Sequence, residues 1–105
     1  MPKSVLIVDD HPIVRQGLRQ IISEIPGVVT IDESENGQDA LNKISATSYD
    51  LVLLDISLPI MSGLEVLSRI NKDEISKRVI MLSIHDEEQF AIRALKLGAM
   101  GYLTK

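Results

Sequence analysis

The chain has 105 residues, of which 15 are acidic and 11 are Lys or Arg, and its formal net charge at pH 7 is −4. Hydrophobic residues make up 45% and charged residues 25%, as in one ordinary globular domain, which excludes a fibrous or disordered chain. The absence of cysteine excludes a disulfide framework, a thiolate zinc site and a thiol nucleophile. Since no apolar run approaches the ~20 residues of a membrane helix and no basic cluster is present, we predict a cytoplasmic domain that contacts neither membrane nor nucleic acid directly.

The first elements are a strand and a helix. Residues 5–8 form a continuous apolar run, which is typical of a strand buried on both faces. Pro12 suits the first turn of a helix, and Pro26-Gly27 ends it. The predicted inner stripe of this helix, at spacings of four, three and four residues, is formed by Val14, Leu18, Ile21 and Ile25.

The next elements repeat this alternation. Val29 and Ile31 alternate with polar neighbours and predict a half-buried second strand near an edge of the sheet. Asn36-Gly37 leads into a second helix, and residues 51–54 are another fully apolar strand that ends at Asp55. The inner face of the second helix is predicted to carry Ala40, Leu41 and Ile44.

The second half of the chain continues in the same way. Ser62 is a suitable N-cap for a third helix, in which Gly63 serves the geometry between loop and helix. Residues 79–82 predict a fourth strand that ends at Ser83. Asp86 begins a predicted fourth helix that Gly98 ends, and residues 101–104 form a short fifth strand.

Strands separated by crossovers of helical length are expected to pair in parallel, in an open, doubly wound α/β sheet. In such sheets the functional crevice lies beyond the carboxyl ends of the strands. The residues at or just after those ends are Asp9, Asp10, Asp55, Ser83 and Lys105. We therefore expect three carboxylates, one hydroxyl and one ammonium group to meet in one crevice.

This set of groups suits phosphoryl transfer. Three carboxylates repel one another and need a counter-charge, which a hard divalent cation such as Mg²⁺ supplies. Asp55 can act as a carboxylate nucleophile, with Asp10 and Asp55 on the metal. Ser83 and Lys105 would then hold the phosphoryl oxygens. His11 and His85 are interpreted as exposed histidines rather than metal ligands, because single nitrogen donors on two loops are weak evidence for a site.

Four segments carry a resemblance to a known family. They are Val8-Asp9-Asp10-His11-Pro12, residues 53–59 followed by Gly63, Met81-Leu82-Ser83, and residues 98–105. In this order, and over all 105 residues, the chain resembles a response-regulator receiver domain, the phosphoacceptor part of two-component signalling. Residues 9–18 further resemble the NarL/LuxR-type subgroup, whose members usually carry a DNA-binding helix-turn-helix domain after the receiver.

The resemblance implies a fold and a role for each site residue. The implied fold is a flavodoxin-like five-stranded parallel sheet of order 2-1-3-4-5. Asp55 is similar to the phosphorylated aspartate, Ser83 to the switch residue that binds the phosphoryl group, and Lys105 to the lysine that pairs with it. Tyr102 is similar to the aromatic side chain coupled to that switch. The implied Mg²⁺ site uses Asp10, Asp55, the backbone carbonyl of Ser57 and, through water, Asp9.

The implied function is a phospho-switch and not an enzyme. Its partners would be a sensor histidine kinase, the protein's own C-terminal output domain and, in a homodimer, a second copy of the chain. Two alternatives are a receiver without a DNA-binding output and a module that keeps the fold without being phosphorylated. A small Mg²⁺-dependent phosphohydrolase is the third, but that class has an acid two residues after its nucleophile, where this chain has Ser57.

The length also carries an expectation. The chain ends at Lys105, directly after the fifth strand, whereas a receiver continues into a fifth helix. We therefore expect residues 1–105 to be a receiver truncated after strand 5, with the fifth helix missing. Such a chain should leave an apolar strip uncovered over strands 1 and 5 and be prone to dimerise through it.

Overall fold

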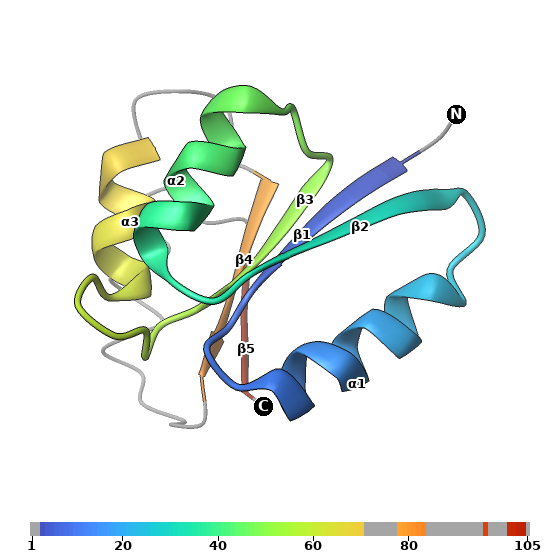
Figure 1. The fold of residues 1–105 in the computed structure, drawn as a ribbon, viewed down its shortest axis with the longest axis horizontal. Coiled ribbons are helices and arrows are strands. Elements are labelled where there is room, and N and C mark those ends of the chain that lie inside the picture. Colours follow the sequence, from blue (N-terminus) through green and yellow to red (C-terminus); the bar gives the residue numbers. More distant parts are fainter. Residues whose placement is uncertain (1–2, 71–77, 84–95, 97–100, 105) are drawn as a thin grey trace.

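The computed structural model describes residues 3–70, 78–83, 96 and 101–104 (Figure 1). The helices are α1 (Pro12–Ser23), α2 (Gly37–Ala46) and α3 (Gly63–Ile70). The strands are β1 (Lys3–Val8), β2 (Val28–Ser34), β3 (Leu51–Asp55), β4 (Val79–Ser83) and β5 (Gly101–Thr104). The predicted fourth helix between Asp86 and Gly98 lies, except for residue 96, outside the described residues.

The five strands form one sheet in the order β2-β1-β3-β4-β5, and each neighbouring pair is parallel. The predicted flavodoxin-like order is therefore confirmed. Figure 1 shows α2 and α3 side by side on one face of this sheet and α1 on the other. In the described part of the chain, no helix is long and apolar enough to cross a membrane.

The larger core lies between the sheet and the α2–α3 pair. Leu6 and Val8 of β1 face this side, whereas Val5 and Ile7 face α1, because successive side chains of a strand point to opposite faces. Both faces of the central strands are apolar, which explains their continuous hydrophobic runs. The buried residues of the α2–α3 side come from β1, α2, β3, the loop after it, α3 and β4, and include Ala40, Ile44, Val52, Leu54, Val66, Leu67 and Met81.

The α1 side is more open, and here the predicted helix stripe is partly wrong. Leu18 and Ile22 pack against the sheet, but Ile21 and Ile25 remain 63% and 50% exposed. Ile22 shares a face with Leu18 because it is four residues further along the helix. Ile25 misses that face because α1 ends at Ser23, two residues earlier.

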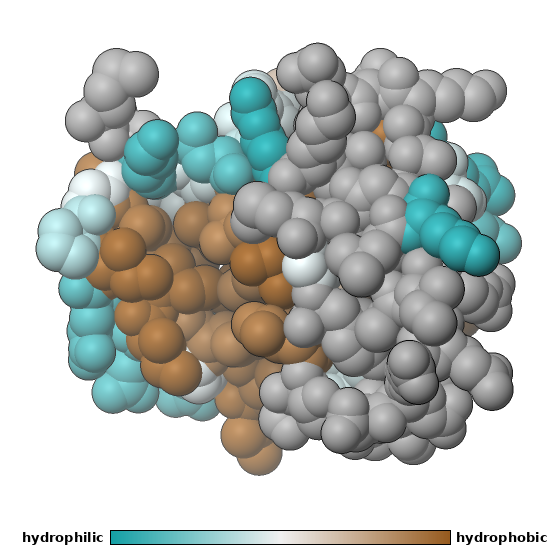
Figure 2. Space-filling model, turned by 180° about the vertical axis from the view of Figure 1, so that it is seen from behind, coloured by the Kyte–Doolittle hydropathy of each residue, from teal (hydrophilic) through white to brown (hydrophobic). Residues whose placement is uncertain are grey.

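Apolar side chains also reach the surface on this side, as Figure 2 shows from behind. Leu103 of β5 is exposed, and its register partner Leu82 belongs to the α1-side cluster. Val5 and Ile7 of β1 are buried. Among the described residues, the large exposed apolar side chains on the α1 side include Ile21, Ile25 and Leu103. The predicted uncovered strip over strands 1 and 5 stays a prediction, because residues 84–95, 97–100 and 105 lie outside the described part of the chain.

Polar contacts tie the start of β3 to the two neighbouring strands. The buried Tyr49 donates a hydrogen bond of 2.6 Å from its hydroxyl to Asp32 Oδ2. Burial first, and then this carboxylate, raise the pKa of Tyr49 to about 12. Beside it, the carboxylate of Asp50 accepts a 2.9 Å bond from the backbone N–H of Ser4, which lowers the pKa of Asp50. These contacts join β1, β2 and the start of β3.

Candidate functional site

The predicted acidic residues meet at the carboxyl edge of the sheet. The backbone N–H of Asp9 donates to the Ser34 carbonyl at 3.0 Å, which extends the β1–β2 ladder by one residue. Val8 pairs in register with Leu54, so Asp9 follows β1 beside the point where β3 ends in Asp55. Both carboxylates are buried, with 0% and 1% of their residue surface exposed. Parallel pairing thus places two charged groups inside the protein.

The backbone after Asp55 is held in place by α3. A Cβ atom on Gly63, at the start of α3, would lie 2.0 Å from the backbone oxygen of Asp55. The N–H of Gly63 donates to the Ile56 carbonyl at 2.8 Å, and Ser57 donates its N–H to Asp55 Oδ1 at 3.2 Å. The predicted N-cap is also present, since Ser62 Oγ accepts the Glu65 N–H at 3.2 Å. Only glycine allows this approach, so Gly63 contributes to the position of Asp55.

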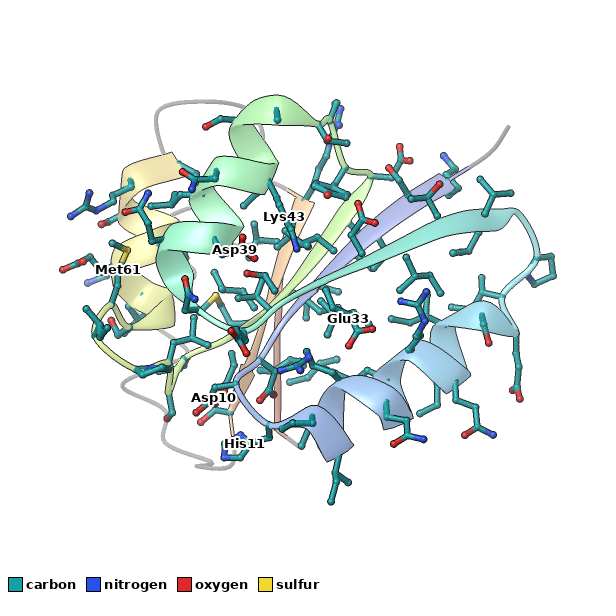
Figure 3. All side chains as sticks on the ribbon, viewed as in Figure 1. Asp10, His11, Glu33, Asp39, Lys43 and Met61 are labelled. Carbon is teal, nitrogen blue, oxygen red and sulfur yellow. The ribbon has the colours of Figure 1, made fainter. Side chains whose placement is uncertain are left out.

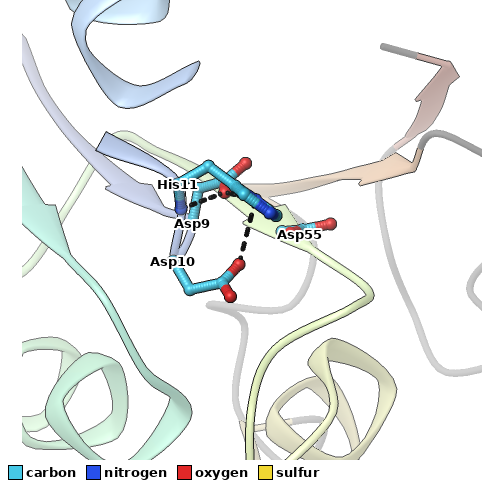
Figure 4. Close-up of side chains that lie close together, drawn as sticks. All are labelled: Asp9, Asp10, His11 and Asp55. Carbon is cyan, nitrogen blue, oxygen red and sulfur yellow. Dashed lines mark hydrogen bonds and ion pairs between the residues drawn. The ribbon is translucent and has the colours of Figure 1, made fainter. Parts of the chain in front are cut away.

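His11 completes a group of four side chains, which Figure 4 shows together. Its Nδ1 lies 3.0 Å from Asp9 Oδ1 and 3.1 Å from Asp10 Oδ1. One ligand atom from each of Asp9, Asp10, His11 and Asp55 lies within 4.8 Å of the others. Sequence reasoning interpreted His11 as exposed, and its side chain is indeed 62% exposed, but its inner nitrogen reaches the acids.

Ser83 lies at the same edge and is fully buried. It ends β4, directly after Leu82, whose register partner is Asp55. Tyr102 lies within β5, opposite Met81. Lys105 and His85 lie outside the described residues. The structure thus brings Asp9, Asp10 and Asp55 together, with Ser83 at the adjacent strand end.

A network of charged side chains, which no motif in the sequence predicted, supports this edge from the side of β2. Arg15, one turn into α1, donates to the Asp9 carbonyl at 2.6 Å and pairs with Glu33 at 3.1 Å. Arg19 also pairs with Glu33 at 3.1 Å. No spacing rule relates residues of α1 to residues of β2, so these ion pairs could not be predicted from the sequence. Arg15 holds Asp9 in place through its backbone carbonyl.

The network continues into α2. Lys43 contacts the Glu33 carbonyl and lies 3.2 Å from Asp39 Oδ2. Asp39 accepts a 2.8 Å bond from the Ser34 hydroxyl, and this bond is the first cause of its lowered pKa. Figure 3 shows Asp39 and Lys43 beside one another, with the Glu33 side chain on the α1 side of β2. A groove of about 490 Å³ here is lined by polar side chains, several of which pair with one another.

The loop after β3 contains a strained turn. The N–H of Met61 donates to the Pro59 carbonyl at 2.7 Å, which closes a γ-turn around Ile60. Ile60 has a φ of 67°, a left-handed conformation that β-branched residues rarely adopt. Its side chain is fully exposed. The loop borders a groove of about 340 Å³ that Asp10 also lines, so the strain lies next to the acidic group.

The acidic group has the chemistry of a divalent-cation site. Carboxylate oxygens from two strand ends are hard ligands, which Mg²⁺ prefers in proteins. Asp10 Oδ1 is buried and accepts no hydrogen bond of good geometry, although His11 Nδ1 lies near it. A cation at this position would satisfy that oxygen and offset the repulsion between the carboxylates.

Comparison with known proteins agrees with this arrangement. A family model described as "Response regulator receiver domain" matches residues 5–105. The nitrate/nitrite response regulator protein NarL of Escherichia coli is 38% identical over 104 residues, which are 99% of this chain and 48% of NarL. The chain therefore spans about half the length of the curated relatives it matches.

Two solved structures show the same fold. A LuxR-family two-component response regulator from Aurantimonas superposes with a TM-score of 0.91 at 33% identity, over 100% of this chain and 75% of that chain. The response regulator TrrA from Thermotoga maritima, solved in complex with Mg²⁺-BeF, superposes with a TM-score of 0.85 at 37% identity. That match covers 98% of this chain and 86% of TrrA.

Proposed function

Because the chain belongs to the response regulator receiver domain family, we propose that Asp55 is the phosphoacceptor of a two-component system. The observation that carries this proposal is the position of Asp55. Its carboxylate is buried at the end of a central strand, beside Asp9, Asp10 and His11 and next to the end of β4. A sensor histidine kinase is the expected phosphodonor.

In the proposed reaction, a carboxylate oxygen of Asp55 attacks the phosphorus atom of a phosphohistidine. The P–N bond breaks, its electron pair returns to the imidazole of the donor, and an acyl phosphate forms on Asp55. Bound Mg²⁺ would neutralise charge on the phosphoryl oxygens. Asp10, Asp55 and the Ser57 carbonyl would hold it, with Asp9 acting through water. TrrA, solved with Mg²⁺-BeF, supports this choice of metal.

Three further residues are proposed to convert phosphorylation into a change of surface. The buried hydroxyl of Ser83 is at the adjacent strand end and is proposed to donate to a phosphoryl oxygen. Lys105 is proposed to pair with the same group, and Tyr102 to follow the movement of Ser83. These roles come from the resemblance of the motifs and remain predictions for Lys105 and for the Tyr102 side chain.

The output of this switch is proposed to be a DNA-binding domain elsewhere in a longer protein. NarL is about twice as long as this chain, and the Aurantimonas match is a LuxR-family regulator. Phosphorylation would bias a conformational equilibrium that this domain, or a second receiver, reads. The domain described here would then contact protein partners rather than DNA.

The test is phosphorylation by a small donor, measured as intact mass. The purified protein is incubated with acetyl phosphate, with Mg²⁺ or with EDTA. We expect the mass of one phosphoryl group in the wild type with Mg²⁺ and none with EDTA. Asp55→Asn should gain nothing, whereas Asp50→Asn, at the other end of the same strand, should behave as the wild type. Equal labelling of Asp55→Asn and the wild type would refute the assignment.

A further inference from the structure

The environment of His11 is unusual for an exposed side chain. His11 occupies the N-cap position of α1, yet its side chain makes no capping hydrogen bond to that helix. Its ring is instead directed toward the carboxylates, as Figure 4 shows. Its Nδ1 is the nitrogen donor of the cluster among the residues that the structure describes. The side chain therefore serves neither the helix end nor the core.

The distance between Nδ1 and Asp10 matches that between neighbouring ligands of one metal ion. In an octahedral site with metal–ligand bonds of about 2.1 Å, adjacent ligand atoms lie about 3.0 Å apart. Nδ1 lies 3.1 Å from Oδ1 of Asp10, a proposed direct ligand. It also lies 3.0 Å from Oδ1 of Asp9, which is proposed to act through water. A cation bound by Asp10 and Asp55 would thus have Nδ1 within reach.

We propose that Nδ1 of His11 is a direct ligand of the divalent cation at the Asp10–Asp55 site. This inference rests on the proposed function, because it concerns the same metal site. One imidazole nitrogen added to carboxylate oxygens favours Mn²⁺, Co²⁺ and Ni²⁺ over Mg²⁺, which prefers oxygen alone. His11 then sets which cation this receiver takes when several compete.

Coordination and a simple hydrogen bond make different demands on the ring. In a hydrogen bond to Asp9 or Asp10, Nδ1 carries the proton and donates it. As a ligand, Nδ1 offers its lone pair to the metal, and the ring proton resides on Nε2. A measurement that detects a direct bond between Nδ1 and the metal therefore distinguishes coordination from a hydrogen bond.

The direct readout is the magnetic coupling between bound Mn²⁺ and nitrogen, measured by pulsed electron paramagnetic resonance on untagged protein. The chain has two histidines, His11 and His85, so two variants assign the signal. We expect directly coordinated nitrogen in the wild type and in His85→Gln, and its loss in His11→Gln. Incorporation of ¹⁵N-labelled histidine into the wild type should change the coupling to that of ¹⁵N, which tests the assignment without any substitution.

Affinity gives a second readout. Loss of His11 should weaken Ni²⁺ binding by about tenfold or more, and leave Mg²⁺ binding within about twofold. Titration calorimetry of the wild type, His11→Gln and His85→Gln with each metal alone measures both values. Equal loss of affinity for Ni²⁺ and Mg²⁺ in His11→Gln would overturn the inference, because it would indicate a general effect on the site.

The outcomes separate this inference from the proposed function. If Mn²⁺ binds without histidine nitrogen, or with nitrogen from His85, the inference is wrong, while Mg²⁺-dependent phosphorylation of Asp55 stands. If His11 nitrogen is detected but Asp55 is not phosphorylated, the inference stands and the proposed function is wrong. If no divalent cation binds the wild type, both the inference and the proposed Mg²⁺ site are wrong.

Discussion

The two ends of β3 each carry an aspartate, and the two are held in opposite ways. Asp50, just before the strand, is exposed and accepts a hydrogen bond from the Ser4 N–H at 2.9 Å, while its own N–H donates to the Ser4 carbonyl at 2.9 Å. Asp55, at the end of the strand, is 1% exposed and lies within a group of acids. The Asp50 carboxylate thus links β1 to β3 through a hydrogen bond, whereas the Asp55 carboxylate lies close to other carboxylates of like charge.

The difference shows how one strand serves both stability and function. At the amino end a charge is stabilised by a backbone donor in contact with water. At the carboxyl end, we expect burial beside Asp9 and Asp10 to raise the free energy of the folded state, because like charges repel, and a bound metal ion would offset this repulsion. Neutralising the two aspartates should therefore have opposite effects on stability.

The largest effect is expected at Gly63, which allows α3 to contact the backbone of Asp55. In Gly63→Ala the new Cβ would overlap the Asp55 backbone, so we expect a loss of about 2 to 3 kcal/mol in the free energy of unfolding. Gly17→Ala is the control, because a Cβ at that helical position meets nothing within 4 Å and should stabilise by about 0.5 to 1 kcal/mol. Urea unfolding measures both, and equal values would contradict the close approach.

The next effect compares the two aspartates directly. Without metal, Asp55→Asn should raise the free energy of unfolding by about 1 to 2 kcal/mol, because it removes repulsion from neighbouring carboxylates. Saturating Mg²⁺ should stabilise the wild type and so remove the difference in the free energy of unfolding between the wild type and Asp55→Asn. Asp50→Asn should lower the urea midpoint with or without Mg²⁺. Destabilisation by both substitutions would contradict the opposite roles of the two ends.

A smaller effect concerns the strained loop beside the acids. Ile60→Gly removes the cost of a β-branched residue at a φ of 67°, and its exposed side chain buries nothing that would be lost. We expect a gain of about 0.5 to 1 kcal/mol after the entropy cost of glycine is subtracted. Val29→Gly, at another exposed β-branched residue with ordinary backbone, should be destabilising. A loss of stability in Ile60→Gly would show that the turn is not strained.

The smallest effect is the pH dependence at the amino end. The Ser4 N–H holds the pKa of Asp50 below its usual value in the folded protein. A lowered folded pKa contributes stability above the unfolded pKa, near 4, that is lost as pH falls through the folded value. Urea midpoints followed from neutral pH to about pH 3 should therefore fall less steeply in Asp50→Asn than in the wild type. The same fall of the urea midpoint with pH in both proteins would show that Asp50 does not contribute to the pH dependence of stability.

The sequence was sufficient for the sheet and for most of the acidic group. Residues 5–8 and 51–54 are apolar on both faces, and a strand that ends in an acid places that acid at the carboxyl edge. The register of Val8 with Leu54 then brings Asp9 and Asp55 together. Periodicity thus predicts the strands and the acids at their ends, whereas the strand order that places β1 beside β3 came from the resemblance to receiver domains.

The errors arose where tertiary contacts decide the outcome. The stripe through Ile21 and Ile25 failed because nothing in the pattern marks Ser23 as the last helical residue. The contact of Arg15 with Asp9 had no signal in the sequence, and His11 was interpreted as exposed rather than as part of the acidic group, since both contacts depend on how α1 leaves β1. The roles of Lys105 and Tyr102 remain predictions from the motif.

The most direct test of the central claim is to locate the phosphoryl group on the chain. The wild type is phosphorylated with acetyl phosphate and Mg²⁺, reduced with borohydride to convert the acyl phosphate to an alcohol, and digested for peptide mass spectrometry. We predict one reduced residue, at Asp55, and none at Asp9, Asp10 or Asp50. Reduction at another aspartate, or none at Asp55 in a protein that has gained phosphoryl mass, would contradict the account.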